Sequence, residues 1–488
     1  MRRGSFAMRT MIQGGWVVGH RNGSHYILRN GQCVIEGDKI IHIGRAYQGE
    51  LKKTVNARNR LITPGLISTH LHAGNNTSNH LYLDNGRPEA IGRNYLNWQA
   101  RRRDGVREDP NRLSALFGLA QCMRSGVTTA VEIGCGGVSP EIFVGAVDEL
   151  GVRVYTGPSY RNALVYSAND GRLEYDWDQE RGGRGLEVAV QFVRDFDGAA
   201  GGRLRAILCP GHTDTCDPRV LVQTAEYAAE LRVPITIHSA INPHETLRVL
   251  DTHRLSPVEL LAKQGLLGPQ VILGHCVFIS GHSWLPYSQS RDLELLGENG
   301  ATVSHAPYKY MQMGACLESV ASYISAGVNV TIGTDITPSD IVKEMRLAML
   351  GSRISDRSFL SSTPRDVFDA ATVNAANALG RSDLGRLEPG AKADIAIFNL
   401  DKLNFGFVHD PIRALVEAGS GADLEALLVD GRFVMADGRL LLIDEDEILA
   451  CTQAEGRSML NAIPNWLWGQ RSADEAVPLA YTIEGDGT

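Results

Sequence analysis

Four histidines and one aspartate stand at the ends of short runs of strand-forming residues. His70 and His72 follow "GLIST", His238 ends "VPITIH", His275 ends "QVILGH" and Asp335 ends "VTIGTD". Because side chains two positions apart on a strand face the same side, His70 and His72 can both point at one centre. Neutral imidazoles and a carboxylate suit a borderline divalent cation such as Zn²⁺, with one position left open for water. These five residues predict a metal centre that activates water for hydrolysis.

Such a centre needs a scaffold that brings separate strand ends together. Eight strand-like runs alternate with helical patterns in the middle of the chain. The runs cover residues 65–69, 127–133, 152–157, 203–209, 233–238, 270–275, 301–305 and 328–335. This alternation predicts an α/β fold, a (β/α)₈ TIM barrel, in which the carboxyl ends of all the strands meet at one mouth.

Alternating apolar segments with glycine punctuation precede and follow this middle part. They predict a small, discontinuous β-sandwich made by the N- and C-terminal segments, residues 1–64 and 386–450. The barrel would then occupy residues 65–385. We expect the tail, residues 451–488, to pack on the barrel or on a neighbouring subunit.

Composition narrows the set of partners. The net charge of -8 and the lack of a basic stripe argue against nucleic acid or a membrane as partner. The eight cysteines show no paired spacing, and there is no secretory stretch, so we expect reduced thiols and a cytoplasmic protein. No Arg or Lys stands at a motif position where it could bind a carboxylate. Aromatic and methionine residues near strand ends favour a small, mostly neutral, apolar or aromatic substrate. The long segment 72–103 after the first strand is expected to shape its pocket.

Five segments of the chain together resemble the amidohydrolase superfamily. They are "LITPGLISTHLH", "VPITIHSA", "VILGHCVFIS", "VTIGTDITPSDIVKEMR" and "RLEPGAKADIAIFNLD". Within the superfamily, "AILCPGHTDTCDPRVLVQTAEYAAELRVPITIH" is most similar to the mononuclear aminohydrolase branch of triazine hydrolases, nucleobase deaminases and phenylurea-type hydrolases. The resemblance implies one divalent ion, Zn²⁺ first, with Fe²⁺, Co²⁺ or Mn²⁺ as alternatives, and a homodimer or higher oligomer.

The resemblance also assigns roles to single residues. His70, His72 and His238 would be metal ligands, and Asp335 would be a ligand that also accepts a proton from water. His275 would contact the metal or stabilise the oxyanion. His212, in "PGHTDTC", occupies a position that orients the substrate in that branch.

Two positions depart from the family pattern. No lysine ends the fourth strand, so a carbamylated-lysine, two-metal centre is not supported, and Glu132 is read as structural rather than as a ligand of a second metal. The branch usually has a glutamate three residues after the strand-five histidine, and here that residue is Ile241. Asn242 and His244 beside it, and His305 after the seventh strand, are further candidates for substrate contacts.

Ile241 determines which of the candidate reactions the sequence favours. An isoleucine cannot move a proton, and deamination of a purine or pyrimidine depends on protonating a ring nitrogen. The sequence therefore favours cleavage of an amide, urea or carbamate C–N bond. Deamination or dechlorination of a nitrogen heterocycle is the alternative, and a non-catalytic barrel is a third, which the five metal-type residues argue against.

Overall fold

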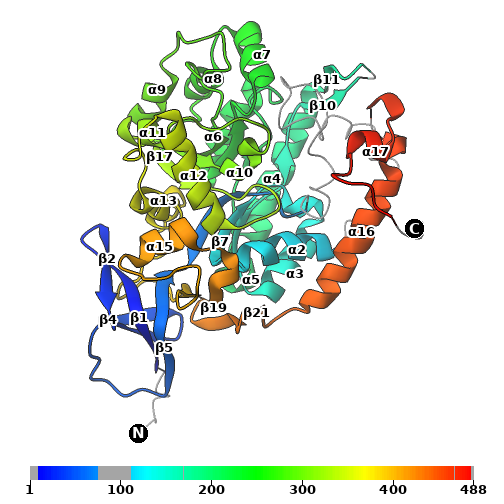
Figure 1. The fold of residues 1–488 in the computed structure, drawn as a ribbon. Helices are drawn as coiled ribbons and strands as arrows, with labels where there is room; N and C mark the ends of the chain where they lie inside the picture. Colours follow the sequence, from blue (N-terminus) through cyan, green and yellow to red (C-terminus); the bar gives the residue numbers. More distant parts are fainter. Residues whose placement is uncertain (1–8, 75–111, 169, 467, 485–488) are drawn as a thin grey trace.

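The computed structural model describes residues 9–74, 112–168, 170–466 and 468–484, and Figure 1 shows the chain as a ribbon. Most of segment 72–103, which we expected to shape the pocket, lies outside these residues. No helix in the described ranges is long and apolar enough to cross a membrane.

Two four-stranded parallel sheets make the central barrel. The first has the order β12-β8-β7-β6 and the second the order β14-β15-β16-β17. Their strands are β6 (Leu66–Leu71), β7 (Val127–Glu132), β8 (Arg153–Thr156), β12 (Leu204–Ala206), β14 (Ile235–Ser239), β15 (Val271–His275), β16 (Thr302–His305) and β17 (Asn329–Ile332). Each of the eight predicted runs overlaps one of these strands, although β6 and β14 extend beyond the predicted ends at residues 69 and 238. Parallel bridges from Leu208 to Ile235 and from Leu71 to Asp335 join the two sheets into a closed barrel.

Helices surround the barrel, and several of them begin with a capping side chain followed by proline. For example, Asp217 caps the helix that begins with Pro218, and Asn242 caps the one that begins with Pro243. The helices of the barrel region are α2 (Arg112–Met123), α3 (Pro140–Leu150), α4 (Gln179–Phe196), α5 (Ala199–Gly202), α6 (Pro218–Leu231), α7 (Pro243–His253), α8 (Pro257–Lys263), α9 (Asp292–Glu298), α10 (Pro307–Met311), α11 (Val320–Ser325), α12 (Ile341–Ser355), α13 (Pro364–Ala370) and α14 (Val373–Ala378). Short strands β9 (Ser159–Tyr160), β10 (Ala163–Ser167), β11 (Leu173–Trp177) and β13 (Cys209–Pro210) lie between them.

The N- and C-terminal segments share one nine-stranded sheet, at the bottom of Figure 1. Its strands are β1 (Arg9–Arg21), β2 (Ser24–Arg29), β3 (Gln32–Glu36), β4 (Lys39–Gly44), β5 (Lys53–Pro64), β18 (Ile395–Asn399), β19 (Leu424–Val429), β20 (Arg432–Ala436) and β21 (Arg439–Leu440). Antiparallel pairing of β5 with β18 joins the two segments. The fold class is thus confirmed, whereas the exact domain boundaries stay a prediction.

Buried charges connect this sheet to the barrel. Arg153, 1% exposed on β8, lies 3.3 Å from Asp394 and 2.8 Å from Asp430. Two further helices, α15 (Pro411–Ala418) and α16 (Glu445–Trp466), follow β18 and β21, and α17 (Ala473–Ala476) comes last. Helix α16 packs along α2, where Ser114 donates a hydrogen bond to Glu455 at 2.7 Å.

Candidate metal centre

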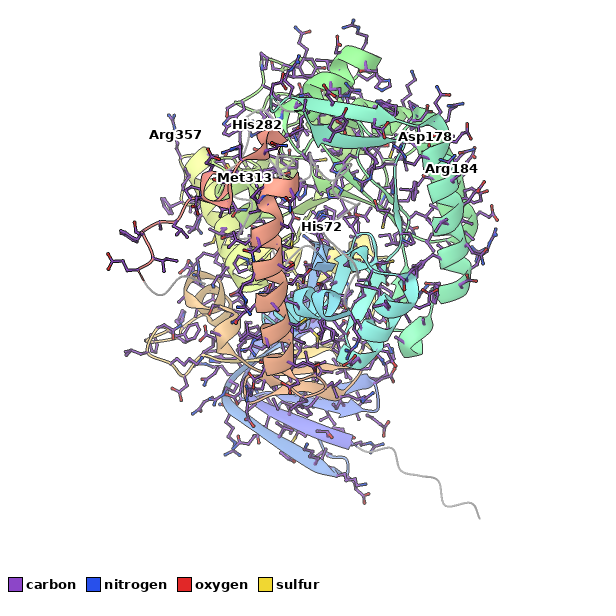
Figure 2. The ribbon with its side chains drawn as sticks, turned by 90° about the vertical axis from the view of Figure 1, so that its right-hand side faces the viewer. His72, Asp178, Arg184, His282, Met313 and Arg357 are labelled. Carbon is purple, nitrogen blue, oxygen red and sulfur yellow. The ribbon has the colours of Figure 1, made fainter. Side chains whose placement is uncertain are left out.

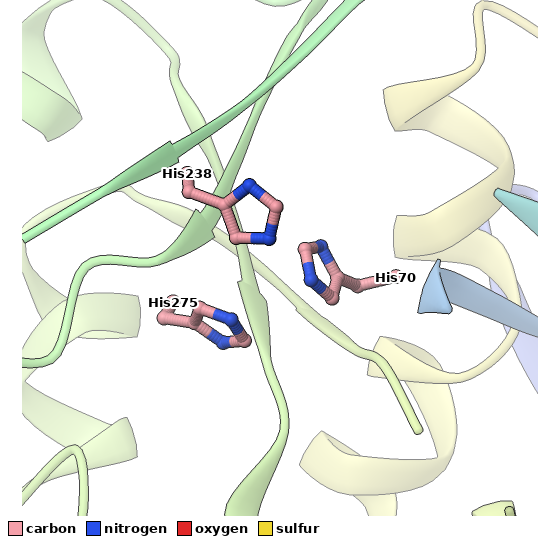
Figure 3. A group of neighbouring side chains, drawn as sticks. All are labelled: His70, His238 and His275. Carbon is pink, nitrogen blue, oxygen red and sulfur yellow. The ribbon is translucent and has the colours of Figure 1, made fainter. Parts of the chain in front are cut away.

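The five residues predicted to hold a metal converge at the carboxyl ends of the barrel strands. His70 and His72 come from the end of β6, His238 from β14 and His275 from β15, while Asp335 follows β17. Two groups each gather one ligand atom per residue within 4.8 Å, namely His70, His238 and His275, and His70, His72 and Asp335. Figure 3 shows the imidazoles of the first group turned toward one another. His72, labelled near the middle of the view in Figure 2, has a side chain that is 17% exposed.

The geometry of the imidazoles fits a shared cation. The carbonyl of Gly211 accepts a hydrogen bond from His238 Nδ1 at 2.9 Å, so Nδ1 carries the proton and Nε2 keeps its lone pair. His238 Nε2 faces His72 Nε2 at 3.1 Å. Two ligands of a tetrahedral zinc ion with bonds of about 2.0–2.1 Å lie about 3.3 Å apart, which is close to this separation.

Unpartnered polar atoms also mark the site. Both ring nitrogens of His70 and Oδ1 of Asp335 are buried and have no hydrogen-bond partner among the described residues. Buried polar atoms are normally paired, so this exception calls for a ligand. The donor set of neutral imidazoles and a carboxylate therefore fits a divalent cation.

Glycines make room for His70. A Cβ at Gly274 would lie 2.7 Å from His70 Cε1, and one at Gly333 would lie 2.6 Å from His70 Cβ. Separations below 3.0 Å are essentially never seen for real Cβ atoms. The glycines in "VILGH" and "VTIGTD" thus let β15 and the end of β17 approach the first ligand strand.

Strained backbone holds two of the candidate ligands at and just beyond the strand ends. His275 has φ +84° and Asp335 has φ +52°, in a region that non-glycine residues seldom adopt. Asp335 is tied to β6 at both main-chain groups, because its N–H donates to His70 O at 2.9 Å and its carbonyl accepts from His72 N at 3.0 Å. Its carboxylate can therefore change position only by side-chain rotation.

Burial sets the protonation of the histidines. It lowers the pKa of His275 to about 3 and the pKa of His70 and His238 well below the ordinary value. The three imidazoles are neutral at pH 7, which is the form that binds a metal. Burial alone would raise the pKa of the Asp335 carboxyl, but the nearby Lys309 ammonium holds it well below its usual range.

Lys309 is the site residue that the sequence analysis missed. It lies on α10, is 4% exposed, and its Nζ stands 3.2 Å from Asp335 Oδ2. No motif in the sequence predicts a lysine at this mouth. The available signal was a charged residue among apolar and aromatic ones in "HAPYKYMQM", directly after the seventh strand.

Glu132 has a structural place, as expected. It is fully buried at the end of β7, where it accepts hydrogen bonds from Gly136 N at 2.7 Å and Thr156 Oγ1 at 2.8 Å. Burial raises its pKa to about 7, although these donors oppose the shift. Glu132 belongs to neither of the ligand groups found among the described residues.

The predicted substrate-binding residues fall into two pairs. His212 lies against the candidate metal centre, with its ring stacked on His238 at 4.3 Å between centroids. His305 is the buried last residue of β16, where burial lowers its pKa to about 3. His244 instead stacks on Tyr175 at 6.1 Å. The side chain of Asn242 caps α7, since its oxygen accepts from Glu245 N at 2.7 Å. Asn242 therefore serves the helix, and the substrate contacts stay predictions.

The position of the missing carboxylate is filled by a buried apolar side chain. Ile241 is 4% exposed, and its N–H donates to Glu245 Oε2 at 3.1 Å. Together with the cap from Asn242, this bond makes a reciprocal pair at the start of α7. Glu245 thus holds the turn after β14, which agrees with a supporting role rather than a proton shuttle.

A model of the amidohydrolase family matches residues 61–434. The chain belongs to the amidohydrolase family. It is 29% identical over 440 residues to a 5'-deoxyadenosine deaminase of Methanosarcina barkeri, covering 89% of this chain and 95% of the relative. It is 27% identical over 449 residues to a 5-methylthioadenosine/S-adenosylhomocysteine deaminase of Pyrococcus abyssi, covering 91% and 97%.

Solved structures support the same fold. An atrazine chlorohydrolase of Arthrobacter aurescens complexed with zinc has a TM-score of 0.76 at 23% identity, covering 91% of this chain and 99% of its own. An adenosine deaminase of Xanthomonas campestris with bound zinc also has a TM-score of 0.76, at 18% identity, covering 93% and 99%. The predicted family and fold are confirmed. This amidohydrolase is an enzyme that hydrolyses carbon–nitrogen bonds other than peptide bonds, which sets aside the non-catalytic barrel.

Proposed function

We propose that this amidohydrolase is a metal-dependent deaminase that removes the exocyclic amino group of a purine nucleoside by hydrolysis. The observation that carries the proposal is the convergence of His70, His72, His238, His275 and Asp335 in a chain similar over about nine-tenths of its length to deaminases of adenosine derivatives. This reverses the order given by the sequence alone, because similarity over the whole chain supports ring deamination more strongly than one position opposes it.

The ion is proposed to be a single Zn²⁺. Neutral imidazoles and a carboxylate suit it, and both neighbouring structures named above were determined with zinc. When bound, such an ion lowers the pKa of a water and polarises the electrophile. His70, His72 and His238 would hold it, with Asp335 as the fourth protein ligand.

Side chains of this protein would transfer the proton, orient the attacking water and position the base. Asp335 takes a proton from the attacking water on a carboxylate oxygen and returns it to the leaving nitrogen. Neutral His275, whose Nε2 is 3.4 Å from Asp335 Oδ2, can hydrogen-bond the attacking water oxygen and hold it in line with the ring carbon. His212, stacked on His238, forms one wall against which a planar base can lie.

Ile241 supports a second candidate. No carboxylate stands at that position to protonate a ring nitrogen, and Glu245 is already engaged with the Ile241 N–H. An amide, urea or carbamate does not need a protonated ring. Cleavage of such an acyl C–N bond is therefore the competing proposal.

A substrate panel separates the two candidates. It pairs adenosine, 5'-deoxyadenosine and 5-methylthioadenosine with N-aryl ureas and amides, and measures ammonia and arylamine release by the zinc-loaded enzyme. We expect kcat/KM for a purine nucleoside to exceed that for every urea or amide by at least about 100-fold. Release of arylamine alone would favour the second candidate, and no release from either class would overturn the proposal.

Ile241→Glu tests the missing carboxylate directly. If the enzyme deaminates without an acid at this position, the new glutamate should raise turnover of nucleosides by about tenfold or more, because it can protonate the ring nitrogen. Ile241→Gln is the matched control, with the same size and no acid. Equal changes in the two variants would show that the shape of the pocket, not the proton, matters here.

A further inference from the structure

A lysine on the short helix after the seventh barrel strand lies beside the proposed metal centre. Lys309 lies on α10, which begins two residues after β16 ends at His305. Its side chain is buried, and its Nζ is 3.2 Å from Asp335 Oδ2. An ammonium this close to a fully buried carboxylate is a strong electrostatic partner, because little water screens the pair.

The position of Lys309 is fixed by its main chain. The Tyr308 N–H donates to Glu344 Oε2 at 2.9 Å, and Glu344 is 1% exposed on α12. This bond ties the first turn of α10 to α12. The lysine therefore reaches Asp335 from a fixed base.

The two oxygens of Asp335 have different surroundings. Oδ1 lies 3.7 Å from Nε2 of His72, which forms one of the two candidate ligand groups with His70 and Asp335. Oδ2 lies next to Lys309 and 3.4 Å from His275 Nε2. Since the main chain of Asp335 is tied to β6, only rotation of its side chain could exchange the two oxygens.

We propose that Lys309 is a positioning residue that holds Oδ2 of Asp335 and thereby assigns Oδ1 to the metal. The carboxylate then binds the ion through one oxygen and keeps the other, beside His275, for the proton. This inference rests on the role of Asp335 in the proposed hydrolysis. It adds the group that divides the work between its two oxygens.

The proposal predicts opposite effects on metal binding and on turnover. The ammonium repels a cation and competes with it for the carboxylate, so its loss strengthens metal binding. Without the ammonium, the carboxylate of Asp335 can turn both oxygens to the ion. Loss of the ammonium therefore also weakens proton transfer. If Lys309 had a merely structural role, its removal would lower metal affinity, turnover and stability together.

Lys309→Met removes the charge and keeps the length of the side chain. By competition with a chromophoric chelator, we expect Zn²⁺ to bind at least about tenfold more tightly than in wild type. We expect kcat to fall at least about tenfold, with KM within threefold. Weaker or unchanged Zn²⁺ affinity would overturn the proposal. Lys343→Met, which removes an exposed lysine paired with Asp340, is the matched control and should change neither quantity.

A double-mutant cycle shows whether Lys309 acts through Asp335. In an Asp335→Asn background the tightening of Zn²⁺ binding by Lys309→Met should shrink at least about fivefold. Equal tightening in both backgrounds would mean that the ammonium acts on the ion through space, and would refute the assignment. Lys309→Arg retains the charge, so its Zn²⁺ affinity should stay within threefold of wild type. That variant keeps the proposal testable if Lys309→Met does not fold. The Zn²⁺-affinity measurements need no substrate, so their failure is distinct from failure of the proposed deamination.

Discussion

Gly274→Ala should displace His70, a proposed metal ligand, without changing any charge. The new Cβ would lie 2.7 Å from His70 Cε1 and 3.0 Å from His70 Nδ1, whereas ordinary contact begins at 3.4 Å. The imidazole must therefore move by about 0.7 Å, a third of a zinc–nitrogen bond of about 2.1 Å. Gly274 has no positive φ, so alanine adds no backbone strain and the effect comes from the contact alone.

The expected magnitude follows from that displacement. Disturbing what orients a metal ligand typically lowers metal affinity about 10–100-fold, which is about 1.4–2.7 kcal/mol. Overpacking in the closed barrel should add a loss of about 1–3 kcal/mol in unfolding free energy with excess chelator present. Competition with a chelator measures the first quantity and urea unfolding measures the second.

A matched glycine provides the control for this prediction. A Cβ at Gly145, on α3, meets no atom within 4 Å, so Gly145→Ala should leave metal affinity unchanged. It should also stabilise α3 slightly, because alanine favours a helix over glycine. Wild-type affinity and stability in Gly274→Ala would refute the reasoning, since they would mean that His70 does not pack against β15 as the structure has it.

Three further predictions concern charge. Asp335→Asn should keep the fold, checked by circular dichroism, and lower kcat about 10²–10⁴-fold because the proton acceptor is gone; near-normal turnover would identify another base. Glu132 has its pKa raised by burial from 4.5 to about 7, so the folded wild type binds more protons in that window and loses stability as pH rises through it, by up to about 3 kcal/mol. The unfolding free energy of Glu132→Gln, measured with urea and taken relative to wild type, should therefore increase from pH 5 to pH 8. A pH-independent difference would contradict this. Arg153→Met leaves the buried Asp394 without its ion-pair partner, while Asp430 keeps Lys392 at 2.9 Å, and should cost about 3–5 kcal/mol of stability with Zn²⁺ affinity unchanged.

Residues on regular strands were the ones that the sequence could place. His70, His72, His238 and His275 lie at or next to the last residue of a strand, and the parallel barrel brings those ends together by its topology. The motif "NPHE" also carries a readable signal, because Asn followed by Pro and Glu is typical of a helix start. Read that way, Asn242 would have been assigned to the cap of α7 rather than to a substrate.

Residues on short irregular segments could not be placed in this way. Lys309 lies on a five-residue helix, and whether its side chain faces Asp335 or solvent depends on the contact of Tyr308 N with Glu344, 36 positions later. Stacking of His212 on His238 likewise depends on the loop after β13. Periodicity carries no information about either contact, since both arise only when separate elements pack.

The pairing of β5 with β18 has a consequence for how the enzyme is made. Thr63 contacts the Ala396 carbonyl across 333 residues, and β5 leads through Gly65 directly into the strand that carries His70 and His72. A ribosome adding about 5–20 residues per second needs roughly 20–70 s to supply that partner strand. During this interval His70 and His72, the first two proposed ligands, emerge without the anchor that fixes their strand. Metal uptake is therefore expected to follow synthesis of the C-terminal sheet rather than to accompany emergence of the barrel.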